Sequence, residues 1–596
     1  MHEFRVWAPR VLKAAVKIGS AVYPMHGPSE RGWWSVAVAQ AGPGTEYGFL
    51  LDDDAQAWHD PRSLWQPDGV HGLSRVYDQA EFAWSDTGWD APPLSRAVIY
   101  ELHVGTFTAD GTFDSAIERL DYLAELGITH VELMPVAEFP GERGWGYDGA
   151  SLFAVYEKYG GPDGLKRLVD ACHARGLAVL LDVVYNHFGP VGNYSGKFGP
   201  YLTEKHRTPW GAAVNFEDWG SDEVRCFFCD NALMWMRDYH VDGLRLDAVH
   251  EFVDRSAVHF VEQLTEEVRV LSRKLGRRLV LIAESDLNDP RMLKPCEIGG
   301  YGMDAQWSDD FHHALFAVLH SGGGEKGYYV DFGSVAKLAK ALTKTFVQDG
   351  TYSKYRGRRH GRPVDDLSPH QFLGYIQNHD QVGNRAVGDR VEQIAGMDRA
   401  KVAAGIVMTA PFIPMIFQGE EFAASTPFQY FADHDDPEMA QAVKDGRRGE
   451  FAAFGWKPED IPDPEDAATF LRSKLRWDEV HAGRHGEMLE WYRRLIALRR
   501  GSPSLNDGQP GQTQAAFDEE KKWLVIERGT VTVMGNLGIE TVELDNPRRL
   551  PLLLASSASV LAMNDRVVLP PDTLAVLSAE TIYSELCRIS YLHIST

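Results

Sequence analysis

The chain has 596 residues, of which 44% are hydrophobic and 24% are charged, and its formal net charge is −25. This length predicts more than one domain, and the negative charge argues against nucleic acid or an anionic membrane as a partner while allowing neutral sugars. Five cysteines are too few for a disulfide framework, and neither a basic leader nor a long apolar run is visible, so we expect a cytoplasmic protein.

Residues 1–90 are predicted to form an immunoglobulin-like β-sandwich. Short alternating runs such as Phe4–Trp7 and Trp34–Val38 are separated by Gly and Pro turns, which is typical of a small all-β domain. The stretch Ser85–Ser95, which contains two adjacent prolines, is interpreted as a linker.

From about residue 97 strands and helices alternate, which predicts a (β/α)8 TIM barrel over residues 91–500. The predicted strands are 98–104, 128–136, 177–185, 241–249, 279–285, 303–307, 372–377 and 412–418, and the predicted helices are 113–126, 164–175, 221–240, 256–275, 334–346, 390–409 and 485–500. Eight strands with intervening helices favour a barrel. An open doubly wound sheet is the alternative, but it needs a glycine-rich turn after its first strand, and Val104–Phe107 is not one.

Two insertions, at 187–220 and 419–484, follow barrel strands. Loops in these positions build the sites of such barrels. Strand-like runs return after the last barrel helix, for example at Trp523–Glu527, so residues 501–596 are predicted to form a C-terminal β-sandwich domain. The tail 583–596 has no recognisable pattern.

Acidic residues stand at the ends of four apolar segments: Asp182, Asp247, Glu284 and Asp380. A charge at the tip of a buried strand is costly unless it is paired or functional. Because parallel barrel strands end at the same face, four such positions predict one acidic pocket at the mouth of the barrel.

Arg245 and Asp247 are two residues apart on one predicted strand, so their side chains share a face, and both point into the barrel if the neighbouring leucines face the helices. We expect Arg245 to keep Asp247 ionised and to lower its pKa, as suits a carboxylate nucleophile. A structural ion pair inside the barrel is the alternative interpretation.

Glu284 follows the apolar run Leu281–Ala283, which predicts a raised pKa and the role of general acid. Neighbouring strands are about 4.8 Å apart, so Asp247 and Glu284 fit the carboxyl separation of about 5–5.5 Å that retaining glycosidases use. Asp380 would face them across the mouth. His187 and His379 either donate hydrogen bonds to sugar hydroxyls or serve the fold.

A metal site is an alternative, because these segments are rich in oxygen donors. However, Arg245 among the carboxylates opposes a cation, and neither an HExxH motif nor an EF-hand loop is present. We therefore expect no metal and no cofactor in the catalytic site.

These segments resemble the signatures of the α-amylase family of glycoside hydrolases in order and in spacing. The matching segments are Asp182–His187, Gly243–His250, Glu284, His379–Asp380 and Trp145–Asp148. The resemblance implies that Asp247 is the nucleophile, Glu284 the acid/base and Asp380 the transition-state stabiliser, with Arg245 as the partner of Asp247. It also implies that Tyr147 stacks on a sugar in the −1 subsite, and it places Asp148 with it in the substrate site.

Longer strings resemble the branch of this family that hydrolyses maltooligosyltrehalose. They are Glu132–Pro140, Ala283–Arg291, Trp307–His313, Gly327–Gly333 and Gly419–Phe428. The resemblance implies cleavage of the α-1,4 bond that joins trehalose to a maltooligosaccharide, and it implies maltooligosyltrehalose synthase as a functional companion. The candidates to hold trehalose in the +1 and +2 subsites are His250, Glu251, Asp286 and Trp307.

The sequence departs from calcium-binding α-amylases in its insertion at 187–220, which is short. Asn186 stands where those enzymes place a metal ligand, but the partner loop is not evident, so we expect no structural calcium.

The sequence leaves three alternatives to this activity. A glucan branching enzyme, which converts α-1,4 into α-1,6 linkages, resembles this chain in its leading β-domain and its barrel, and other glucan hydrolases of the family share the barrel. A carbohydrate-binding protein without activity is disfavoured, because the set of catalytic acids with Arg245 is complete. The product distinguishes the two main hypotheses, since release of trehalose excludes branching as the main activity.

Overall fold

Eight parallel strands close into a barrel in the computed structural model of the chain, which describes residues 1–320, 327–452 and 456–580. The predicted (β/α)8 barrel is thus confirmed, and the open doubly wound sheet is excluded because the last strand pairs with the first. The predicted bounds of the three domains remain predictions. The tail 583–596 lies outside the described residues.

The barrel strands follow the chain order around the barrel. They are β7 (Ile99–Leu102), β8 (His130–Leu133), β11 (Ala178–Val183), β14 (Gly243–Leu246), β15 (Val280–Ala283), β16 (Ala305–Trp307), β19 (Phe372–Gly374) and β20 (Ile413–Phe417). Each lies within or against a segment predicted as a strand.

Strand alternation separates the contents of the barrel from the helix-facing layer. A small apolar cluster contains Leu180, Ile282 and Trp307 and fills the barrel interior, whereas Leu244 and Leu246 belong to the large core shared with the helices. Because side chains alternate along a strand, the residues two positions after Leu180 and Ile282 lie on the same interior face. Those residues are Asp182 and Glu284, so the apolar interior gives way to charged groups at the mouth.

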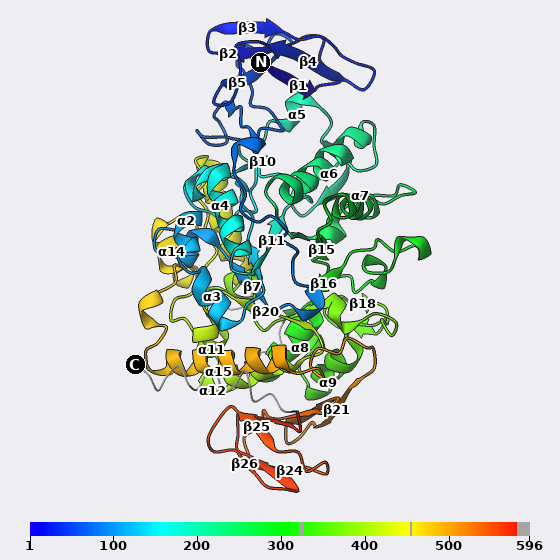
Figure 1. Cartoon of the computed structure of the whole chain (residues 1–596), viewed down its shortest axis with the longest axis vertical. Helices are drawn as coiled ribbons and strands as arrows, with labels where there is room; N and C mark the ends of the chain where they lie inside the picture. The colour runs from blue at the N-terminus through cyan, green and yellow to red at the C-terminus, as the bar shows by residue number, and fades with distance from the viewer. Residues whose placement is uncertain (321–326, 453–455, 581–596) are drawn as a thin grey trace.

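Helices cover the outside of the barrel (Figure 1). The longer ones are α4 (Gly161–His173), α6 (Ser221–Asp238), α7 (Phe260–Leu275), α8 (Asp309–Leu319), α9 (Val335–Lys344), α12 (Met397–Thr409) and α15 (Gly483–Gly501). Among them α4, α7 and α9 are clearly amphipathic, and each buries its apolar stripe.

Two predicted helices are each divided in the structure. The segment 390–409 forms α11 (Val391–Ala395) and α12, because Gly396 between them has a φ of 88°, which an α-helix cannot contain. The segment 113–126 forms α2 (Phe113–Ile117) and α3 (Leu120–Leu126). Arg119 between them has a ψ of −2°, and its guanidinium covers the ring of Trp477 at 4.5 Å.

All-β regions lie at both ends of the long axis, with the barrel between them (Figure 1). The N-terminal region pairs β1 (His2–Trp7) with β4 (Trp33–Val38), and a second sheet has the order β3 (Ala21–Pro24), β2 (Ala14–Ile18), β5 (Glu46–Leu51), β6 (Ser74–Arg75). The C-terminal region has a five-stranded sheet of β21 (Thr513–Asp518), β22 (Trp523–Arg528), β23 (Val531–Asn536), β28 (Thr573–Ser578) and β25 (Leu552–Ala555). Its second sheet contains β24 (Val542–Asp545), β27 (Arg566–Leu569) and β26 (Leu561–Ala562).

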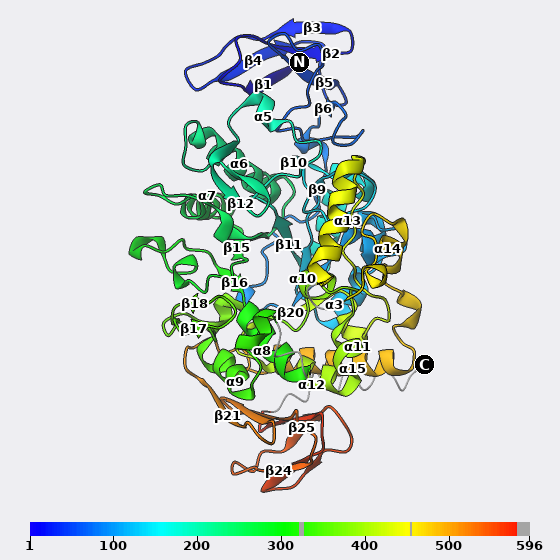
Figure 2. The same ribbon diagram turned by 180° about the vertical axis from the view of Figure 1, so that it is seen from behind.

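Both predicted insertions contribute to the mouth of the barrel. The first contains the short helix α5 (Ser195–Phe198) and the hairpin of β12 (Leu202–Thr208) and β13 (Gly211–Val214), and the second contains α13 (Pro437–Ala452) and α14 (Ala467–Arg472). Figure 2 shows α13 beside α10 (His379–Gly383), and Arg447 of α13 donates a 2.7 Å hydrogen bond to the carbonyl of Gly383. Within the described residues, no helix combines the length and apolar character needed to cross a membrane.

Candidate active site

Arg245 joins two of the predicted catalytic acids. Its Nη1 donates a 2.8 Å hydrogen bond to Oδ1 of Asp247, and its Nη2 lies 2.8 Å from Oε2 of Glu284 as an ion pair. Asp247 accepts a second hydrogen bond from the amide of Asn186 (2.8 Å), and Glu284 accepts one from the backbone N–H of Ala248 (2.8 Å). The structure therefore brings Asp247, Glu284 and Arg245 together, from the ends of β14 and β15.

Asp182 at the end of β11 completes this charge arrangement. Arg245 donates a 2.7 Å hydrogen bond to its Oδ2, and the hydroxyl of Tyr147 donates to the same oxygen at 2.5 Å. Arg245 is fully buried, so three surrounding carboxylates replace its hydration. The guanidinium is held in one orientation by several charge-assisted contacts.

Asp380 lies at the mouth, about one-third exposed, and the amide of Asn384 donates a 3.0 Å hydrogen bond to it. Its charge raises the pKa of both Asp247 and Glu284, so the three predicted acids lie near one another. His379 is buried beside it, with Nε2 3.5 Å from Asp380 Oδ2 and 2.7 Å from the hydroxyl of Tyr147. Tyr147 also stacks on the imidazole, with ring centroids 5.1 Å apart.

The pKa values of Glu284 and Asp247 distinguish their predicted roles only in part. Burial raises the pKa of Glu284 to about 7, against the opposing charge of Arg245. The prediction that Arg245 lowers the pKa of Asp247 is wrong as a net result. Burial also raises the pKa of Asp247 from its ordinary value, because desolvation outweighs Arg245 and the amide of Asn186.

The remaining residues predicted for the sugar side lie around this centre. His187 is buried, its Nδ1 lies 2.8 Å from Oδ1 of Asn186, and its ring is stacked under Trp210 of the β12–β13 turn at 4.8 Å. Asp148 is partly exposed, and Nε2 of His434 from the second insertion lies 3.8 Å from its carboxylate. Trp210 is 49% exposed, so its ring offers a flat face to a ligand.

Three of the four residues predicted to hold trehalose form one cluster. Nε2 of His250 lies 3.9 Å from Asp286 and 4.0 Å from Glu251, and all three side chains are partly exposed. Arg356 donates a 2.8 Å hydrogen bond to Asp286. Although burial favours the neutral acid, the charges of His250 and Arg356 lower the pKa of Asp286.

The fourth residue, Trp307, does not join this cluster. Only 2% of it is exposed, and its ring lies inside the barrel with Cζ of Arg245 4.2 Å from the ring centre. The expected contact with trehalose is therefore corrected, because a side chain inside the barrel beside the guanidinium supports Arg245 rather than a sugar.

Three residues around the site were not predicted for it, namely Glu101, Trp210 and Arg356, and Asp182 was predicted for the acidic pocket without a role of its own. Glu101 carries the same signal as the predicted acids, since it is a charged residue within an apolar strand. Trp210 and Arg356 lie in loops, where neither periodicity nor charge pattern indicates which way a side chain points.

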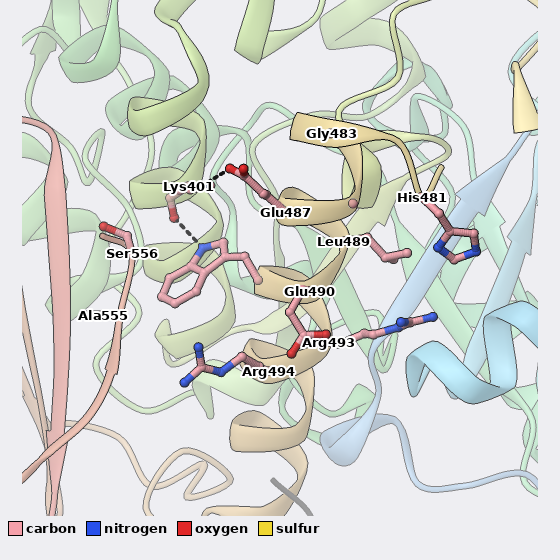
Figure 3. A pocket seen from close by; sticks show the side chains of 12 residues that line it. Lys401, His481, Gly483, Glu487, Leu489, Glu490, Arg493, Arg494, Ala555 and Ser556 are labelled. Atoms are coloured by element: carbon pink, nitrogen blue, oxygen red, sulfur yellow. Dashed lines mark hydrogen bonds and ion pairs between the residues drawn. The ribbon is translucent and has the colours of Figure 1, made fainter. Parts of the chain in front are cut away.

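No group of three or more His, Cys, Asp or Glu side chains within the described ranges is arranged to hold a metal ion. A separate open hollow of about 640 Å³ lies along α15 beside the end of β25 at Ala555 and Ser556, with Lys401 and Trp491 in its wall (Figure 3). None of the residues predicted for the active site lines it. The predicted catalytic acids therefore lie apart from this surface hollow.

Comparison with known proteins agrees with this geometry. The family model for the alpha amylase catalytic domain matches residues 78–206. A malto-oligosyltrehalose trehalohydrolase from Rhizobium sp. (strain M-11) is 48% identical, covering 96% of this chain and 97% of the relative. A crystal structure described as an alpha amylase from Salmonella typhimurium is 37% identical with a TM-score of 0.89, covering 97% of each chain. A 1,4-alpha-glucan branching enzyme from Bacillus caldolyticus is 29% identical and covers 72% of this chain and 66% of its own.

The closed barrel, the arginine-linked acids at its mouth and the matching family model define a glycoside hydrolase of the α-amylase class. The 48% sequence identity with the Rhizobium relative, over almost the full length of both proteins, identifies the family within this class. The chain belongs to the malto-oligosyltrehalose trehalohydrolase family.

Proposed function

We propose that the chain hydrolyses the α-1,4 bond that joins trehalose to the maltooligosyl part of maltooligosyltrehalose. The observation that carries this proposal is the 48% identity over 96% of the chain with a relative of that activity by name. The grouping of Asp247, Glu284 and Asp380 near one another supports it, because the reaction needs an acid, a nucleophile and stabilisation of positive charge. A branching activity has weaker support, from a relative that is 29% identical.

In this proposal Glu284 protonates the oxygen that leaves with trehalose, and Asp247 attacks the anomeric carbon of the glucose in the −1 subsite. A carboxyl with a pKa of about 7 keeps a substantial protonated fraction near neutral pH, as a general acid must. Asp247 accepts hydrogen bonds from Arg245 and Asn186, which hold one geometry for attack. Glu284, now a carboxylate, then activates the water that releases the maltooligosaccharide, and Asp380 supports the oxocarbenium-like transition states.

We further infer retention of anomeric configuration. Inverting enzymes separate their carboxyl groups by about 6.5–9.5 Å to admit a water, whereas retaining enzymes use about 5–5.5 Å. Asp247 and Glu284 contact the two ends of the same guanidinium at 2.8 Å each, which favours the shorter separation. Proton NMR of the fresh product tests this, since retention gives the α-anomer of the new reducing end first.

The decisive assay compares two substrates. The protein is incubated with maltooligosyltrehalose and, separately, with a maltooligosaccharide of the same length, and the products are separated and identified. Release of trehalose from the first substrate at a much higher kcat/KM than any cleavage of the second supports the proposal. New α-1,6 linkages, or equal cleavage of both substrates, would overturn it.

The proposed reaction also implies a functional companion. Trehalose production from this substrate requires an enzyme that builds the trehalose end of a maltooligosaccharide, which makes a maltooligosyltrehalose synthase the functional companion.

We also propose a cytoplasmic location. It is supported by the four cysteines of the described residues, all of which are free thiols. Fractionation of the source cells tests the location.

A further inference from the structure

Glu101 on β7 binds the imidazole and the backbone of His379. Its Oε2 accepts a 3.0 Å hydrogen bond from the backbone N–H of His379, and its Oε1 lies 2.5 Å from Nδ1. Both side chains are 1% exposed. Two contacts from one carboxylate fix the position and the rotation of the ring.

The ring continues into a chain of contacts that ends at the proposed nucleophile. Nε2 of His379 lies 2.7 Å from the hydroxyl of Tyr147, and that hydroxyl lies 2.5 Å from Oδ2 of Asp182. Oδ2 of Asp182 in turn accepts from Nη1 of Arg245, the atom that also binds Asp247. Glu101 is thus linked to Asp247 through four intervening side chains, with no contact to the substrate space.

The direction of these hydrogen bonds depends on the charge of His379. As an imidazolium it donates from both nitrogens, so the hydroxyl of Tyr147 must give its proton to Asp182. As a neutral ring that keeps its proton on Nδ1, it offers Nε2 as an acceptor, and Tyr147 can then turn its proton away from Asp182. A neutral His379 therefore competes with the buried Asp182 for its hydroxyl donor.

We propose that Glu101 is a positioning residue of the active site, which holds His379 as an imidazolium and thereby fixes the hydrogen bonds of Tyr147, Asp182 and Arg245 around the nucleophile. The proposal rests on the catalytic roles given above. Glu101 does not touch the reacting atoms and acts only through this chain of side chains.

The charges around His379 support this assignment. Burial alone lowers the pKa of the ring, but Asp380 and Glu101 raise it to about 9, against the opposing charge of Arg245. The other titratable groups that face it are His103 at the end of β7, Glu132 on β8, Asp182 on β11 and the hydroxyl of Tyr147. Glu101 is the one among the described residues that hydrogen-bonds its Nδ1.

The neighbouring strand provides a matched control. Glu132 pairs with Glu101 in the register of β7 and β8 and is also 1% exposed, but neither of its carboxyl oxygens has a hydrogen-bond partner. Burial, together with the charges of Glu101 and Asp182, raises its pKa well above the ordinary value. Glutamine has the shape of a neutral glutamic acid, so Glu132→Gln should change the charges around His379 little. Glu101→Gln instead removes the negative charge that lies beside His379.

The experiment measures the pH dependence of kcat/KM on maltooligosyltrehalose for the wild type, Glu101→Gln and Glu132→Gln. It also measures the titration of His379 by NMR, assigned with a His379→Gln variant. Loss of a charge within hydrogen-bond distance lowers the pKa of a histidine by about 1–3 pH units. In Glu101→Gln we expect His379 to titrate at least about one pH unit lower. The alkaline limb of the kcat/KM profile should then depend on the loss of two protons instead of one. Glu132→Gln keeps the wild-type profile.

Three results would overturn the proposal: a His379 pKa below about 7.5 in the wild type, an unchanged alkaline limb in Glu101→Gln, or the same change in Glu132→Gln. The titration in the wild type needs no variant of Glu101, so the test stands even if Glu101→Gln does not fold. It also needs no activity, so it separates this proposal from the proposed function, which fails if the wild type releases no trehalose.

Discussion

Nη2 of Arg245 lies 2.8 Å from Oε2 of Glu284, although Arg245 comes from β14 and the acid follows β15. The guanidinium favours the ionised form of Glu284, yet burial dominates and raises the pKa of this carboxyl to about 7. A general acid needs a pKa near the working pH, so partial compensation by Arg245 is more useful than either influence alone.

The first prediction concerns the two acids that Arg245 joins. Asp247→Asn and Glu284→Gln should each lower kcat for trehalose release by about 100-fold or more, because nucleophile and general acid contribute at least that much. Steady-state assays give the rates, and circular dichroism shows whether each variant is folded. A folded variant with more than about a tenth of the wild-type rate would remove its residue from the proposed role.

The second prediction concerns pH. The proposed mechanism needs the protonated form of Glu284, so kcat/KM should decrease as the pH rises through about 7, the pKa of this group. The decrease should follow one proton until His379 titrates near 9. Rates from pH 5 to pH 9 test this sign, and an activity that rises with pH above 7 contradicts it.

The third prediction tests the support of Arg245 by Trp307. Trp307→Leu removes a cation–π contact worth about 0.5–2 kcal/mol, so kcat should decrease by about 2-fold to 30-fold with little change in KM. The control is Trp210→Leu, which alters a half-exposed ring at the mouth and should raise KM instead. An increase in KM alone for Trp307→Leu would restore the original prediction of contact with trehalose.

The fourth prediction concerns recognition of trehalose by the cluster of His250, Glu251 and Asp286. Asp286→Asn removes a charged acceptor, whose hydrogen bonds are each worth about 1.5–3 kcal/mol, so KM for maltooligosyltrehalose should rise about tenfold or more. Cleavage of plain maltooligosaccharide should change little. Asp289→Asn is the control, since Asp289 in the same loop pairs with Arg291 and caps a short helix. Equal losses on both substrates would contradict a role in selection.

The fifth prediction concerns stability at a buried cluster beside α4. His173, whose side chain is fully buried, lies 2.8 Å from Asp86 and 2.9 Å from Asp242. Burial opposes the charge of His173, but the two carboxylates raise its pKa, and His173 in turn lowers the pKa of both acids although burial would raise them. Removal of one partner from such a buried ionic group costs about 3–5 kcal/mol, so His173→Gln should lower the urea midpoint clearly.

The pH dependence of stability follows from these three pKa shifts. The contribution of His173 is full below about 6.5 and is lost as the pH rises through its folded pKa, whereas that of the two acids is present above about 3.9 and is lost at lower pH. The effect of His173→Gln should therefore be largest near pH 5.5 and smaller at pH 9. Arg566→Gln, which breaks an exposed pair with Glu543, should leave the urea midpoint nearly unchanged. Equal effects of the two variants would contradict burial as the cause.

The sequence alone was enough to predict the barrel and the acids at its mouth, because both depend on local pattern. An apolar run that ends in a charge indicates a buried strand that reaches a site, and this holds for Asp182, Asp247 and Glu284 without knowledge of their neighbours. The alternation of strands and helices is equally local. Helix ends were less predictable, as the break at Gly396 shows, because a single backbone conformation decides them.

Only the tertiary structure decided the environment of these acids. Glu101 and His379 are 278 residues apart in sequence, and His187 is stacked on Trp210 from a hairpin whose direction no periodicity encodes. The net pKa of Asp247 and the place of Trp307 inside the barrel depend on how much water each group loses, which is a property of the packed molecule. The sequence pattern therefore indicates which residues reach the mouth of the barrel. Their pKa values and contacts there depend on desolvation and on residues distant in the sequence.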